Sequence, residues 1–248
     1  MAAGRDGQPL PASIRVKVCG ITDPAAMPML ARAGVAYAGL NFFPPSPRCL
    51  GVDQARAVAL AAPPGLARVG LFVDADDALI DTVLASVPLD MLQLHGAEDP
   101  AHVTALRARH GLPVIKAVGI ADAADLPALD RFARVADMLL VDARPPPGAA
   151  LPGGNGLAFD WRLIAGRRWP VPWLLAGGLN ADNVTQAVAL TGARQVDVAS
   201  GVESAPGVKD AGRVASFVAS AQGSDLTGRQ SDPESSPESS PAWAAKPA

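Results

Sequence analysis

The sequence predicts a single closed (β/α)8 barrel of the α/β class, followed by a disordered C-terminal tail. Eight short apolar runs alternate with longer Ala- and Leu-rich segments between residues 14 and 221. This alternation is typical of βαβ units in a parallel sheet. Eight units favour a closed barrel over an open sheet, and the 248 residues suit one such domain, which needs roughly 200 to 250. No GxGxxG motif follows the first run, which disfavours a dinucleotide-binding sheet.

The eight apolar runs are the predicted strands. They are short, continuous and bounded by Gly, Pro or Asp, as expected for parallel strands buried on both faces. They cover residues 15–19, 37–42, 68–73, 90–94, 114–118, 138–142, 173–176 and 195–199.

Helices are predicted after most of these strands. Asp23 is expected to cap the first helix, with Pro24 at its first position, and Asn180 is a plausible cap of a later helix. Between the sixth and seventh strands only residues 159–165 have helical character. The other predicted helices cover residues 23–32, 52–61, 78–86, 100–110, 123–131, 180–190 and 208–221.

The two ends of the chain differ from the barrel in composition. Residues 1–13 carry one Arg and no apolar stretch, so we expect a flexible N-terminus rather than a signal peptide. Residues 222–248 are rich in Ser, Pro, Gly and Glu and nearly devoid of apolar side chains before Trp243. Such a segment buries too little surface to offset its ordering entropy, which predicts a disordered tail.

Composition excludes several classes of protein. A net charge of −3 and an aromatic content of 4% argue against binding to nucleic acid. The sequence contains no run of about 18 uncharged apolar residues, so no membrane span is predicted. It also contains no His or Cys spacing that suggests a structural zinc site. The two cysteines, Cys19 and Cys49, are expected to be reduced thiols in a cytoplasmic protein. The sequence leaves open whether the protein is a monomer or a homodimer.

In a barrel of this type the chemistry lies at the C-terminal ends of the strands. Cys19 ends the first strand, where a thiolate of lowered pKa could act as a base; the alternative is a small buried apolar residue. Asp142 ends the sixth strand and is a poor core residue. Burial would raise its pKa toward the range of a general acid, whereas the alternative is an Asp that caps a turn.

Three further side chains are candidates for contact with a ligand. Arg48 ends a stiff, proline-rich loop and suits a carboxylate, although it could equally be a solvated surface residue. Gln93 and His95 share one face of the fourth strand at a spacing of two and could both point into the mouth of the barrel. A single His is nevertheless more often structural than catalytic.

Glycine-rich turns after the last two strands predict a phosphate site. The turns contain the pairs Gly177-Gly178 and Ser200-Gly201. Small residues let backbone N–H groups approach an anion, and this position is the usual phosphate site of such barrels. The loop of residues 152–156, which includes Gly154, could close over the ligand or be a linker.

Taken in order, the motifs of the chain resemble the phosphoribosylanthranilate isomerase family. Each motif is weak alone, but nine in the right order are specific, and together they span residues 14–218. They are KVCGIT (17–22), GLNFFPPSPR (39–48), GLFVD (70–74), LQLHG (92–96), VIKA (114–117), LLVD (139–142), GGNGLAFDW (153–161), LAGGLN (175–180) and VDVASGVE (196–203).

The resemblance implies a step of tryptophan biosynthesis that needs neither a cofactor nor a metal. In the reaction, N-(5-phosphoribosyl)anthranilate undergoes an Amadori rearrangement to 1-(2-carboxyphenylamino)-1-deoxyribulose 5-phosphate. The resemblance assigns Cys19 as general base and Asp142 as general acid. It also implies that Arg48 contacts the anthranilate carboxylate, that His95 lines the site, and that the two glycine turns bind the phosphate. Gln93 and Gly154 are further candidates for substrate binding.

The chain departs from the family pattern in the loop after the sixth strand. Ala-Arg-Pro-Pro-Pro occupies residues 143–147, and Asn155 stands where Thr is common. Related barrels fit less well. A bifunctional isomerase shared with histidine biosynthesis pairs Asp residues on the first and fifth strands, where this chain has Cys19 and residues 116–118, Lys-Ala-Val. The Lys and Glu constellation of indole-glycerol-phosphate synthase is not evident, and a non-catalytic binder would not keep both Cys19 and Asp142.

Overall fold

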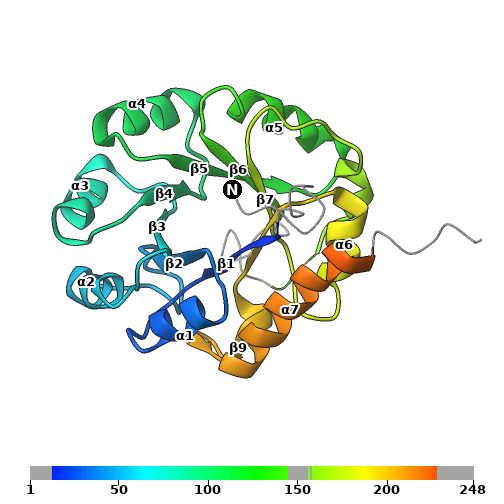
Figure 1. The fold of residues 1–248 in the computed structure, drawn as a ribbon. Coiled ribbons are helices and arrows are strands. Elements are labelled where there is room, and N and C mark those ends of the chain that lie inside the picture. The colour runs from blue at the N-terminus through cyan, green and yellow to red at the C-terminus, as the bar shows by residue number, and fades with distance from the viewer. Residues whose placement is uncertain (1–12, 145–155, 157, 228–248) are drawn as a thin grey trace, which may run out of the picture.

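Eight parallel strands close into a barrel in the order β1 to β8, with β8 pairing back onto β1 (Figure 1). The structure is a computed structural model and describes residues 13–144, 156 and 158–227. The barrel confirms the predicted fold class. Its strands are β1 (Arg15–Cys19), β2 (Tyr37–Asn41), β3 (Ala67–Phe72), β4 (Met91–Leu94), β5 (Val114–Ile120), β6 (Met138–Ala143), β7 (Trp173–Leu175) and β8 (Gln195–Val198).

Alternate residues of each strand face two different cores. On β1, Val16 and Val18 pack outward in the large apolar layer between strands and helices. The inward positions of the other strands form a smaller apolar cluster that includes Tyr37, Ile115 and Leu140. Because both faces are buried, the strands read as the continuous apolar runs expected of a parallel sheet.

Helices form a ring outside the barrel, in which α7 lies between α6 and α1 and closes the circle (Figure 1). Asp76 and Asp99 cap α3 and α4 by accepting hydrogen bonds from backbone N–H groups, as polar N-cap residues commonly do. The helices are α1 (Ala26–Arg32), α2 (Val52–Leu60), α3 (Asp77–Ser86), α4 (Pro100–His110), α5 (Leu126–Phe132), α6 (Val184–Thr191) and α7 (Ala211–Thr227), with the 3-10 turns η1 (Ala123–Asp125), η2 (Trp161–Ile164) and η3 (Ser200–Val202).

Two predicted helix starts were wrong by about one turn. The side chain of Asp23 accepts a hydrogen bond from Ala25 N, but α1 begins at Ala26. Asn180 likewise accepts from the backbone of Asp182 and Asn183, while α6 begins at Val184. In both cases the polar side chain stabilises a turn that precedes the helix, a local pattern that sequence alone does not distinguish from a cap.

The C-terminal third also contains elements that the sequence did not predict. A short antiparallel hairpin, β9 (Glu203–Ala205) and β10 (Val208–Lys209), replaces the predicted start of the last helix. The last helix continues to Thr227, beyond the predicted end at Ala221. Residues 228–248 of the predicted tail lie outside the described residues. Between β6 and β7, the described part of the chain forms only η2, in agreement with the weak helical signal there.

None of the helices in the described ranges is long and apolar enough to cross a membrane.

Candidate active site

Cys19 ends β1 inside the barrel and is only 6% exposed. Its side chain lies over Gly39, the neighbouring residue in the register of β2. A Cβ atom at position 39 would lie 2.8 Å from Cys19 Sγ, so glycine is required to leave room for the thiol. Gly20, at φ +80°, then turns the chain out of the barrel directly after the cysteine.

A buried ion pair lies beside Cys19. Lys17 is fully buried on the same inward face of β1, and its Nζ lies 3.0 Å from Asp197 Oδ1 on β8. Burial raises the pKa of the Cys19 thiol, and the positive charge of Lys17 opposes that effect without reversing it. In the closed barrel the cost of removing a thiolate from water exceeds the attraction of its neighbours, so the pKa of the thiol is raised.

Arg48 lies close to the same end of the barrel, with its aliphatic stem packed over Gly20. Its Nε and Nη2 atoms donate to the two carboxylate oxygens of Glu203 at 2.8 and 2.7 Å. Lys209 Nζ also donates to Glu203, at 2.6 Å, and to the carbonyl of Ala199. Arg48 is therefore a buried member of an ion-pair network rather than a solvated side chain, and its planar guanidinium is fixed by a bidentate contact.

The pKa values in this network shift in the directions that the contacts require. The hydrogen bonds to Glu203 raise the pKa of Arg48. Burial acts to raise the pKa of Glu203, but hydrogen bonds from Arg48 and Lys209 outweigh it and the net shift is downward. Burial lowers the pKa of Lys209, partly opposed by Glu203. The Glu203 carboxylate is thus held in its ionised form between two cations.

Asp142 is the next-to-last residue of β6 and lies on its inward face. It contacts His95, which directly follows β4 and in turn contacts Gln93 on β4. His95 Nε2 lies 3.3 Å from Asp142 Oδ2, and the backbone N–H of Ala143 donates to Oδ1 at 2.8 Å. His95 Nδ1 lies 3.0 Å from Gln93 Nε2. Because an amide nitrogen can only donate, this arrangement places the proton of a neutral imidazole on Nε2, facing Asp142.

The turn that carries His95 rests on a second buried ion pair. Lys116 on β5 donates to Glu98 Oε2 and to the carbonyl of Gly96, both at 2.7 Å. Glu98 in turn accepts from the backbone N–H groups of Gly96 and Asp74. This network fixes the backbone directly after His95 and therefore the direction in which the imidazole points.

The two predicted phosphate turns lie together at the same mouth. Gly177 and Gly178 have positive φ angles of 88° and 61°, and within the described residues their N–H groups donate to no protein acceptor. A Cβ on Gly201 would overlap the carbonyl oxygen of Leu179, so the turns after β7 and β8 touch. Gly156 approaches Ser200 from the loop after β6, whereas Gly154 lies outside the described residues.

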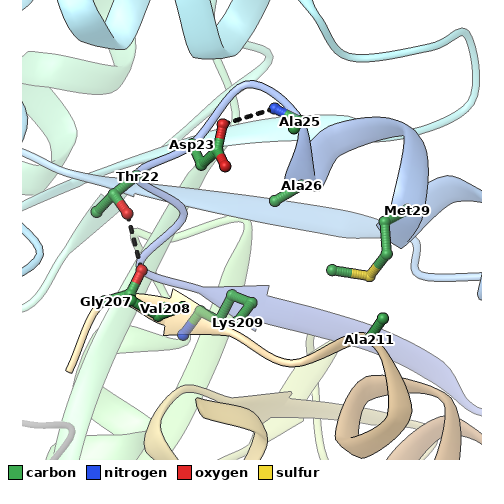
Figure 2. Close-up of a pocket in the computed structure, with 9 residues that line it drawn as sticks. All are labelled: Thr22, Asp23, Ala25, Ala26, Met29, Gly207, Val208, Lys209 and Ala211. Atoms are coloured by element: carbon green, nitrogen blue, oxygen red, sulfur yellow. Dashed lines mark hydrogen bonds between the residues drawn. The ribbon is translucent and has the colours of Figure 1, made fainter. Parts of the chain in front are cut away.

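A hollow of about 270 Å³ lies outside the barrel, between the loop after β1, the start of α1 and the hairpin (Figure 2). The Thr22 hydroxyl donates to the carbonyl of Gly207 at 2.8 Å and ties the loop to the hairpin. The stem of Lys209 lines this hollow while its Nζ reaches Glu203. The hairpin therefore supplies the site with a charged group, the ammonium of Lys209.

Sequence reasoning missed the charged residues that surround the thiol and support His95. The available signal was a charged residue inside an otherwise apolar strand, as at Lys17 and Lys116, which a two-sided buried strand does not tolerate without a partner. The partners Asp197 and Glu98 could not be named, because they are distant in sequence or lie in a loop.

A closed barrel whose C-terminal mouth presents a thiol, a carboxyl group and two glycine-containing turns is typical of a (β/α)8-barrel enzyme. The sequence model of the N-(5'-phosphoribosyl)anthranilate isomerase family matches residues 16–220. This chain belongs to that family, as the nine motifs indicated.

Individual relatives agree. The N-(5'-phosphoribosyl)anthranilate isomerase of Cereibacter sphaeroides (strain ATCC 17029) is 59% identical over 211 residues, covering 85% of this chain and 100% of the relative. The Paracoccus denitrificans enzyme is 58% identical over 209 residues, covering 84% and 97%. Among solved structures, phosphoribosyl anthranilate isomerase from Thermotoga maritima has a TM-score of 0.75 at 34% identity, covering 85% of this chain and 99% of that one.

Proposed function

We propose that this chain catalyses the Amadori rearrangement of N-(5'-phosphoribosyl)anthranilate in tryptophan biosynthesis, with Asp142 as general acid and Cys19 as general base. The observation that carries the assignment is the position of the two side chains. Both lie at the C-terminal ends of barrel strands, Cys19 as the last residue of β1 and Asp142 as the next-to-last residue of β6, and both are nearly buried, at 6% and 7% exposure. A pair of titratable groups with different surroundings at one mouth suits a reaction that needs one proton donor and one proton acceptor.

The reaction begins with Asp142 in its protonated form. The acid gives its proton to the ring oxygen of the ribose, the ring C–O bond breaks, and a Schiff base forms at C1. The Cys19 thiolate then removes the proton from C2, and the electron pair of that C–H bond forms the enolamine, which tautomerises to the ketone. Each proton transfer of this kind contributes typically 10²- to 10⁴-fold to the rate.

The surroundings of Asp142 support its role as a donor. After the acid has lost its proton, the carboxylate faces two N–H donors, His95 Nε2 and the backbone of Ala143. Both stabilise the negative charge at the moment it develops. Gln93 is fully buried behind His95, so we assign it to holding the imidazole tautomer rather than to touching substrate.

Substrate binding is assigned to the remaining predicted residues. We place the phosphate on the N–H groups of the Gly177-Gly178 and Ser200-Gly201 turns, and the anthranilate carboxylate on Arg48. The contact with Glu203 uses Nε and Nη2 of Arg48, and Nη1 carries no hydrogen bond within the described residues. A solved relative, 33% identical with a TM-score of 0.72, is described as a complex with reduced 1-(o-carboxyphenylamino)-1-deoxyribulose 5-phosphate, a ligand of the same chemistry.

We further propose that the protein acts in the cytoplasm, where the free thiols Cys19 and Cys49 stay reduced. Monomer and homodimer both remain compatible with the fold.

A coupled fluorescence assay tests the function. A phosphoribosyltransferase makes the substrate in place from anthranilate and phosphoribosyl pyrophosphate, and the loss of substrate fluorescence is followed after this protein is added. We expect rapid loss with the parent chain and none with Cys19→Ala. If the folded parent leaves the fluorescence unchanged but still binds a phosphosugar, the proposal fails in favour of another substrate or a binding role.

A further inference from the structure

We propose that Lys17, anchored by Asp197, is a positioning residue whose ammonium group stabilises the Cys19 thiolate when it forms. This inference rests on the proposed role of Cys19 as the base. It assigns a function to a buried charged residue that the acid–base mechanism itself does not use.

The geometry of β1 and β8 carries the inference. Lys17 and Cys19 are two residues apart on one strand, so both side chains point into the barrel. Asp197 is the register partner of Lys17 on β8, and its Oδ1 lies 3.0 Å from Nζ. An ammonium group has three N–H donors and is costly to bury with fewer acceptors than that. The next polar group along the same inward face is the sulfur of Cys19.

Charge balance around the sulfur points the same way. The ionisable side chains that face this region come from five elements or loops: Lys17, Asp197, Arg48, Glu203 and Lys209. These are three cations and two carboxylates, so one positive charge is unbalanced while the thiol is neutral. Ionisation of Cys19 completes the balance, which favours the thiolate in a medium of low dielectric constant.

Lys17 is the cation best placed for this role. Arg48 and Lys209 are already committed to Glu203, through a bidentate contact and a 2.6 Å hydrogen bond. Lys17 has a single carboxylate partner, and its charge opposes the effect of burial on the thiol. Burial also lowers the pKa of Lys17 itself, but Asp197 and Cys19 together raise it more, so the lysine stays charged. The proton that leaves the thiol therefore goes to solvent, and Lys17 takes none.

Replacing a buried ion pair by uncharged residues is often tolerated, whereas removing one partner is not. The double variant Lys17→Met with Asp197→Asn therefore removes both charges together. In a Cys49→Ala background, Cys19 is the only thiol of the chain. Its ionisation is then followed directly by the ultraviolet absorbance of the thiolate and by the pH dependence of its alkylation.

We expect the thiol midpoint of the double variant to rise, because Lys17 acts on Cys19 more strongly than Asp197 does. The rise should be smaller than the roughly 1 to 3 units typical for the loss of one nearby opposite charge, because the carboxylate of Asp197 is removed as well. The acid limb of the kcat profile should move with it. Asp197→Asn alone should move the midpoint the opposite way, because it removes a negative charge and leaves Lys17. The matched control is Lys116→Met with Glu98→Gln, a similarly buried pair between β5 and the loop after β4, which should leave the thiol midpoint unchanged.

A folded double variant with the parental midpoint would overturn the inference, as would equal shifts in the double variant and in Asp197→Asn. The proposed function fails separately. If Cys19→Ala turns over at the parental rate, Cys19 is not the base, even where the titration shows that Lys17 stabilises its thiolate.

Discussion

Gly39→Ala is expected to damage the site without touching a charged residue. The added Cβ would lie 2.8 Å from Cys19 Sγ and 3.0 Å from Cys19 Cα. Carbon atoms prefer separations of roughly 3.5 to 4.0 Å, so the thiol or β1 must move by about 0.5 to 1 Å. Overpacking of this kind costs about 1–3 kcal/mol of stability, and a misplacement of about 1 Å costs up to about 10²-fold in rate.

The stability and the activity of Gly39→Ala are measured on the same preparation. Urea unfolding gives the loss in free energy of unfolding, and the coupled fluorescence assay gives kcat/KM. Gly223→Ala is the matched control, because no atom lies within 4 Å of a Cβ at that helical position. It should stabilise slightly, by roughly 0.5–1 kcal/mol. If Gly39→Ala keeps parental kcat/KM and stability, the close packing of thiol on glycine is not what positions the base.

Four further predictions concern the acid, its support, the binding arginine and pH. Asp142→Asn should reduce kcat by about 10²- to 10⁴-fold while circular dichroism and the unfolding midpoint stay near parental values; ordinary turnover would remove Asp142 as the acid. His95→Ala removes one of the two donors to Asp142, so kcat should fall about tenfold to a hundredfold with KM little changed, and a change in KM alone would instead make His95 a substrate ligand. Arg48→Ala should mainly raise KM, and it should also lower stability by about 3–5 kcal/mol, because Glu203 loses its bidentate partner; an unchanged KM in the folded variant would argue against carboxylate binding. Asp90 lies at the opposite end of the barrel, and its hydrogen bonds from Arg68 lower its pKa in the folded state. This pair therefore stabilises the fold above the pKa of Asp in the unfolded chain, and that contribution is lost as the pH falls through the folded pKa. In Asp90→Asn, the loss of unfolding free energy between neutral and acid pH should be smaller than in the parent, by less than about 1 kcal/mol, with kcat unchanged. If the variant and the parent have the same dependence of stability on pH, the pair contributes nothing.

The barrel and the positions of Cys19 and Asp142 at its mouth could be predicted because their signals are local; the catalytic roles of these two side chains stay a prediction. Eight apolar runs define the strands, and the rule that chemistry lies at strand ends selects Cys19 and Asp142. The supporting groups could not be predicted, because each depends on a partner elsewhere. Arg48 suits a free carboxylate in sequence, yet Glu203, 155 residues away, holds it. The direction of the pKa shift of Cys19 could not be predicted, because the burial that raises it depends on the packing of the whole barrel.

The same limit applies to elements of the fold. The β9–β10 hairpin has only five residues of strand, and its second strand, β10, occupies the predicted start of the last helix. Tertiary contacts such as that of Thr22 with Gly207 stabilise the hairpin instead. The early starts predicted for α1 and α6 arose because Asp23 and Asn180 bond to nearby backbone in turns as readily as at caps.

The pairing of β1 with β8 has a consequence for synthesis on the ribosome. Lys17 emerges among the first residues, but its partner Asp197 follows 180 residues later. At a synthesis rate of about 5–20 residues per second, roughly 10 to 40 seconds pass between the synthesis of Lys17 and that of Asp197. The surroundings of Cys19 are therefore completed only when the last strand joins the first. A nascent or truncated chain that lacks β8 carries Cys19 and Lys17 without Asp197, so its thiol has neither the burial nor the complete ion pair that set its pKa in the closed barrel.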